Sequence, residues 1–99
     1  MGIPHTKDMD YFFKAVLSLE NIEECYKFFE DICTVKELFD IAQRFEVATM
    51  LSEGKNYSEI TGKTGASTAT ISRVNHCLKY GSSGYLNVLK KLEIEDKQR

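Results

Sequence analysis

The side chains that could recognise a ligand are concentrated in residues 57–79 of this 99-residue sequence. In the second half of that stretch, apolar residues recur at steps of three or four, as one face of a helix requires: Ile71, Val74 and Leu78. The residues between them are small, hydroxylated or basic: Thr68, Ala69, Ser72, Arg73, Asn75 and His76. Such side chains fit the major groove of DNA, about 12 Å wide, where they hydrogen-bond to bases or phosphates. The pattern therefore favours non-covalent recognition of DNA.

Two helices joined by a tight turn are needed to position these residues. A short helix with one inward apolar residue, Ile60, ends before Gly65, and a second helix begins after its N-cap, Ser67. This is the helix-turn-helix layout, here over residues 57–80. The expected DNA contacts are Thr68, Ala69 and Ser72 in the major groove, Lys63, Arg73 and Lys79 nearer the phosphates, together with Ser67 and Thr70.

Charge is distributed unevenly along the chain. Residues 1–54 carry five basic and eleven acidic side chains, residues 55–80 carry four and one, and residues 81–99 carry four and three. The net charge of −2 is not that of a uniformly basic nucleic-acid-binding protein. A locally basic segment is still compatible with DNA binding. The alternative is a helical protein-interaction module that does not bind DNA.

Catalytic, metal and nucleotide sites are not expected. The run GKT at residues 62–64 matches part of a phosphate-binding loop, but Tyr57 occupies the position of the glycine that the motif requires. His76 and Cys77 are adjacent on a helix and point about 100° apart, so they do not form a catalytic pair. The three cysteines lack the spacing of a zinc site, and we expect buried free thiols in a reducing cytoplasm. The sequence therefore predicts no enzyme activity, no metal and no cofactor.

The remainder of the chain also predicts helices, because it has one proline and no alternating strand pattern. We expect Asp8 or Asp10 to cap the first helix and Asn21 to cap the second. The run TVKE at residues 34–37 is a capping box, and the helix that follows, over residues 35–53, is apolar on most sides. No apolar run is long enough for a transmembrane helix, and no signal peptide is expected at the N-terminus.

We expect a single domain over residues 1–99. It comprises N-terminal dimerisation helices over residues 8–53, the helix-turn-helix over residues 57–80 and a C-terminal helix over residues 85–95. Hydrophobic residues make up 42% of the chain, and eleven residues are Phe or Tyr. That is more apolar surface than so small a chain buries alone, so a second subunit is the expected cover.

The segment GASTATISR, residues 65–73, resembles the recognition-helix signature of the tryptophan repressor family. It is closer still to the repressor-like proteins of Gram-positive bacteria known as the YerC/YecD family, to which the run LFDIAQR at residues 38–44 is also similar. The resemblance extends over residues 8–95 and is most specific in residues 34–80. It implies an all-α fold of six helices, an interleaved homodimer, and a cytoplasmic transcriptional regulator, most simply a repressor, on a two-fold symmetric double-stranded DNA site.

The same resemblance implies a ligand slot between the third helix and the recognition helix. Thr34, Arg44 and Arg73 match residues of the family's tryptophan pocket, and two arginines suit a carboxylate. However, Val74 replaces a glycine of tryptophan repressors, and Cys77 replaces a serine that helps to hold the ligand's amino group. A valine side chain would intrude where the indole ring lies. We therefore expect that Val74 partly fills the slot and that the arginines form ion pairs. Tryptophan is not the expected corepressor, and the sequence does not decide whether another small molecule binds.

Overall fold

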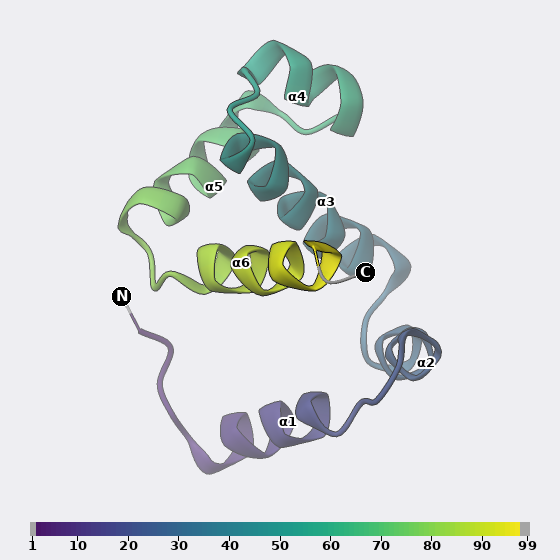
Figure 1. Ribbon diagram of the computed structural model, residues 1–99. Helices are drawn as coiled ribbons and strands as arrows, with labels where there is room; N and C mark the ends of the chain where they lie inside the picture. Colours follow the sequence, from purple (N-terminus) through teal and green to yellow (C-terminus); the bar gives the residue numbers. More distant parts are fainter. Residues whose placement is uncertain (1, 98–99) are drawn as a thin grey trace. The chain divides into compact units, whose positions relative to one another are not determined.

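The computed structural model describes residues 2–97, with side chains for residues 2–93, and every regular element among them is an α-helix (Figure 1). The helices are α1 (Lys7–Leu17), α2 (Ile22–Ile32), α3 (Val35–Ser52), α4 (Tyr57–Thr64), α5 (Thr68–Tyr80) and α6 (Gly84–Lys97). The expected all-α class with six helices is confirmed. The chain divides into two compact units, the N-terminal unit up to Phe39 and the C-terminal unit from Asp40 onwards.

The helix starts follow from short polar side chains that accept hydrogen bonds from the backbone. The prediction that Asp8 or Asp10 caps α1 is wrong: the cap is Thr6, whose side chain accepts from the Met9 amide at 3.1 Å. The two aspartates lie instead in the first turn of α1, where the helix dipole favours negative charge. Asn21 caps α2 as predicted, accepting from the Glu24 amide at 2.8 Å.

The capping box at the start of α3 is confirmed. The Thr34 amide donates to Glu37 Oε1 at 2.8 Å, and the Glu37 amide donates to Thr34 Oγ1 at 3.1 Å. Hydrogen bonding to the Thr34 backbone amide, and secondly to the Thr34 side chain, holds the pKa of the Glu37 carboxyl below its ordinary value. The helix is thus fixed at its first turn by neighbouring residues alone.

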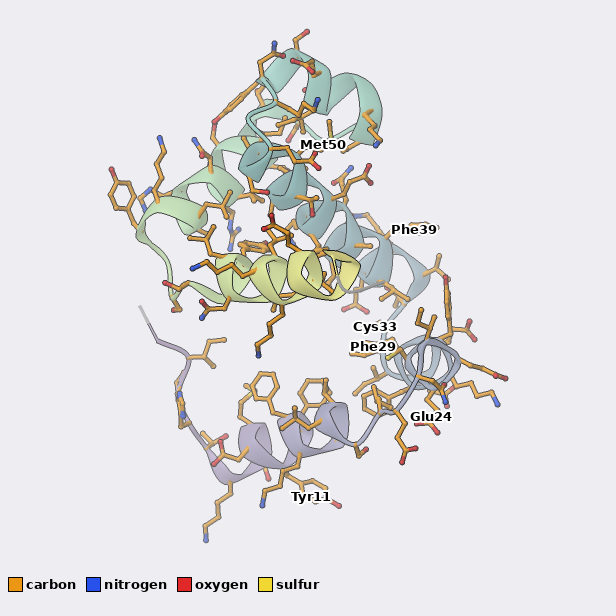
Figure 2. All side chains as sticks on the ribbon, viewed as in Figure 1. Tyr11, Glu24, Phe29, Cys33, Phe39 and Met50 are labelled. Carbon is orange, nitrogen blue, oxygen red and sulfur yellow. The ribbon has the colours of Figure 1, made fainter. Side chains whose placement is uncertain are left out.

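The N-terminal unit buries very little of its own apolar surface. The rings of Phe12 in α1 and Phe28 in α2 stack with their centroids 6.2 Å apart, yet neither helix contains a buried residue. Figure 2 shows Tyr11 and Phe39 projecting outward from their helices, and they are 77% and 70% exposed. Other exposed apolar residues of this unit are Ile3, Phe13, Leu17, Ile22, Tyr26, Ile32 and Val35.

The C-terminal unit has a small core where α3, α4 and α5 meet (Figure 1). Its members are Val47, Ala48 and Met50 of α3, Ile60 of α4, Ala66 between the helices, and Ile71 and Val74 of α5. Tyr85 of α6 packs against this core and lies 6.5 Å from the ring of Phe45, centroid to centroid. The inward positions predicted for the helix-turn-helix are therefore confirmed, with Leu78 partly buried.

The cysteines differ from the prediction in one respect. All three are free thiols, but Cys25 and Cys77 are exposed and Cys33 is half-buried. Cys25 on α2 and Cys77 on α5 lie on helix faces that no described residue covers, which the sequence pattern alone does not show. Within the described residues, no helix is both long enough and apolar enough to cross a membrane.

Candidate nucleic-acid interface

The turn between α4 and α5 depends on a left-handed residue. Gly65 has φ of 74°, and its amide donates to the Thr61 carbonyl at 2.9 Å. The Thr64 hydroxyl donates to the Ile60 carbonyl at 2.7 Å and accepts from the Ala66 amide at 3.1 Å. Because the backbone groups of the turn are satisfied locally, only three residues separate the end of α4 from the start of α5.

Gln43 ties this turn to the long helix α3. Its Nε2 donates to the Thr64 carbonyl at 3.1 Å, across a part-buried contact. Thr64 is the last residue of α4, so this bond satisfies a carbonyl that the helix leaves open. Sequence reasoning missed Gln43 as a positioning residue. The available signal was a polar residue on a helix that is otherwise apolar on most sides.

The recognition helix α5 begins with a cap that uses two of the expected contact residues. Ser67 Oγ accepts from the Thr70 amide and donates to the Thr70 hydroxyl, both at 3.1 Å. Thr70 is half-buried, whereas Ser67 is exposed. These two hydroxyls are therefore engaged with each other at the start of the helix, and they hold the first turn in place.

The other expected contact residues lie on exposed surface. Thr68, Ala69, Ser72 and Arg73 face away from the core on α5, while Ile71 and Val74 of the same helix are buried. Lys63 in the last turn of α4 and Lys79 in the last turn of α5 are exposed as well. One helix thus has a buried apolar face and an accessible hydroxylated and basic face.

Tyr57 is a second residue that sequence reasoning missed. Its hydroxyl lies 3.5 Å from Ser72 Oγ and 3.5 Å from Asn75 Nδ2, so the first residue of α4 contacts two side chains of α5. Asn75, expected on the outer face, is half-buried beside it. A partly apolar residue at a helix start carries no sequence signal for such a long-range contact.

The five residues of the expected ligand slot have different structural positions in this protein. Thr34 caps α3 in the N-terminal unit, and Cys77 is exposed on α5. Val74 is 2% exposed and belongs to the core. Arg44 is half-buried and Arg73 is exposed. The expected ion pairs of these arginines are not found: neither pairs with an acidic side chain among the described residues.

A short helix, a three-residue turn and a second helix with one buried and one polar face define an all-helical helix-turn-helix protein. This chain belongs to the Trp repressor family: the family described as Trp repressor protein matches residues 7–93. It is 50% identical to the protein YerC of Bacillus subtilis (strain 168) over 96 residues, which is 94% of this chain and 92% of that protein.

Two solved structures share the fold. A TrpR-like protein from Eubacterium eligens superposes with a TM-score of 0.88 at 52% identity, covering 90% of this chain and 92% of the other. A candidate Trp repressor from Staphylococcus aureus superposes with a TM-score of 0.88 at 46% identity, covering 91% of this chain and 90% of the other. The resemblance to tryptophan repressors and to YerC that the sequence indicated is confirmed.

The two glycines around the turn provide a test of its geometry. A Cβ added to Gly62, inside α4, or to Gly65, in the turn, meets no atom within 4 Å. We expect Gly62→Ala to stabilise the protein by about 0.5–1 kcal/mol, since alanine favours helix. Gly65→Ala should destabilise it by about 1–2 kcal/mol, because alanine disfavours positive φ. Urea unfolding at one fixed protein concentration measures both, and equal effects of the two substitutions would contradict this account.

Proposed function

We propose that this protein is a sequence-specific DNA-binding transcriptional regulator, most simply a repressor, that acts as a cytoplasmic homodimer. The observation that carries the proposal is the exposed face of α5, on which Thr68, Ala69 and Ser72 lie together above a buried apolar face. Side chains of this size enter the major groove, and a fixed helix presents them in a defined register. Membership of the Trp repressor family supports the same conclusion.

The distribution of charge supports one orientation on DNA. Lys63, Arg73 and Lys79 are exposed in the segment with basic excess, whereas residues 1–54 carry six more acidic than basic side chains. DNA phosphates attract the basic side chains and repel the acidic segment. We infer that the helix-turn-helix, over residues 57–80, is the segment that approaches the duplex.

The exposed apolar residues support the homodimer. Neither α1 nor α2 contains a buried residue, and the first half of α3 exposes Val35, Phe39 and Ile41. Large apolar side chains left exposed in such number indicate a protein interface. We infer that residues 8–53 form the dimerisation region of one domain, which two copies complete. Two copies of α5 would then contact a two-fold symmetric site.

Tryptophan is not the ligand that we propose. Val74 is buried in the core, in the position of a glycine that leaves room for the indole ring in tryptophan repressors. Cys77 replaces the hydroxyl that helps to hold the amino group. Arg44 and Arg73, which pair with no described acidic side chain, would suit a smaller anion. The regulator is therefore independent of tryptophan.

DNA binding can be tested by selecting bound sequences from random duplexes with the full-length protein. We expect a two-fold symmetric motif. Ser72→Ala should change the preferred base at one position per half-site. Lys63→Ala should weaken binding to all DNA sequences equally, and it should reduce the slope of log affinity against log salt concentration by about one unit. Lys27→Ala, an exposed lysine on α2, is the control and should change neither. No retention on DNA at low salt would favour the protein-interaction module instead.

The dimer can be tested by sedimentation equilibrium. We expect a dimer at micromolar concentration and an unfolding midpoint that rises with protein concentration. Phe39→Glu, at a residue 70% exposed in the single chain, should weaken the dimer because it would bury a charge. Tyr80→Glu, at an aromatic residue that is 73% exposed outside the dimerisation region, is the matched control. A stable monomer would refute the proposal.

Titration calorimetry with L-tryptophan tests the ligand. We expect no micromolar binding, because a ring forced into a filled site loses about ten- to a hundredfold in affinity. The double variant Val74→Gly with Cys77→Ser should recover part of the affinity, provided that circular dichroism shows it folded; Cys25→Ser controls for the loss of a thiol. Micromolar binding to the wild-type protein that also tightens its DNA complex would overturn this conclusion.

A further inference from the structure

Tyr57 connects the two helices of the helix-turn-helix beside the exposed face of α5. Its side chain packs against the core of the C-terminal unit, so the ring is held while the hydroxyl reaches the edge of that core. There the hydroxyl oxygen accepts from Ser72 Oγ and from Asn75 Nδ2, at 3.5 Å each. Both contacts are long for hydrogen bonds and weak individually, but together they link one fixed oxygen to two positions on one face of α5.

This contact changes where the Ser72 hydroxyl points. Hydroxyl side chains within helices commonly donate to the carbonyl four residues earlier. Two threonines of this protein do so: Thr49 donates to the Phe45 carbonyl at 2.9 Å, and Thr64 donates to the Ile60 carbonyl at 2.7 Å. Ser72 donates instead to Tyr57, across the space between the helices. In this arrangement the Ser72 hydroxyl is directed to Tyr57 and not to its own backbone.

Counting donors shows what the pair can offer to a ligand. A phenol donates one hydrogen bond and accepts two, and Ser72 and Asn75 occupy both acceptor positions of Tyr57. The Tyr57 hydrogen then has no acceptor among the described residues. If the bond between the two hydroxyls runs the other way, the Ser72 hydrogen is the one left over. In either arrangement one hydroxyl hydrogen is available at the exposed edge of α5.

We propose that Tyr57 is a specificity-determining residue of the DNA interface: with Ser72 it presents one hydroxyl donor to an acceptor on a base edge in the major groove. This inference rests on the proposed function. A base edge is favoured over a phosphate because Ser72 follows Ala69 by three residues, on the same exposed face of the helix. Acceptors in that groove are the N7 and O6 of guanine, the N7 of adenine and the O4 of thymine.

The test is a double-mutant cycle in the full-length protein on a selected DNA site. The variants are Tyr57→Phe, Ser72→Ala and the two combined, with thermal unfolding to verify the fold. Tyr57→Phe removes only the hydroxyl and should lower affinity about two- to tenfold, the range of one net hydrogen bond. Tyr85→Phe is the matched control, since Tyr85 is likewise partly buried against the same core, and it should bind as the wild type does.

Specificity gives the sharper measurement. Affinities for sites altered at each base pair in turn should show that Tyr57→Phe loses discrimination at the base pair where Ser72→Ala also loses it. The combined variant should lose less affinity than the sum of the two single losses, because the one donor depends on both hydroxyls. Fully additive losses, or a loss equal on all sequences with a shallower salt dependence, would overturn the inference, and the latter would indicate a phosphate contact.

The failure of this inference can be told from failure of the proposed function. If the wild-type protein selects no DNA sequence, both are wrong. If it selects a sequence and Tyr57→Phe is indistinguishable from Tyr85→Phe, the inference alone is wrong.

Discussion

The burial of Ile60, Ile71 and Val74 against Val47 is the constraint on which the rest of the C-terminal unit depends. These four residues are 0–2% exposed, and they come from α3, α4 and α5. Short helices such as α4, with eight residues, are not stable alone in water, so α4 exists because its one buried side chain packs on the others. This apolar contact therefore determines the positions of the turn, the cap of α5 and the outer face of α5.

Because the core is small, most of the surface of α5 remains exposed. Only two side chains of this helix are fully buried, and its exposed positions are free of packing constraints. That division explains why small, hydroxylated and basic residues are tolerated on the outer face. It also explains the polar contacts at its margins: Gln43 on the turn and Tyr57 on Ser72 add directional restraints where apolar packing ends. Apolar contacts fix the position of the helix, the Gln43 bond holds the turn before it, and Tyr57 contacts the Ser72 side chain on its outer face.

Local patterns in the sequence predict most of this fold, and contacts between distant residues account for what they do not predict. Caps such as Asn21 and the capping box at Thr34 depend on residues three positions apart, and they were found. Thr6 was missed because two aspartates nearby compete for the same role in a sequence-based argument. Gln43 and Tyr57 contact residues 21 and 15 positions away, which no periodicity encodes. The exposure of Cys25 and Cys77 was missed because an apolar pattern does not reveal whether its cover belongs to the same chain.

Val74 shows how the same core bears on regulation. Tryptophan repressors have a glycine at this position, which leaves room for a ligand between the third helix and the recognition helix. Here the valine side chain is buried in the core with Val47 and Ile71. Burying such a side chain is worth about 1.5–3 kcal/mol, comparable to the coupling free energy of 1–3 kcal/mol typical of an allosteric ligand. A residue encoded in the chain would then supply permanently what a corepressor supplies conditionally. On the proposed function, the protein is competent to bind DNA whenever it is folded and dimeric, and control would act on its concentration or on a different ligand.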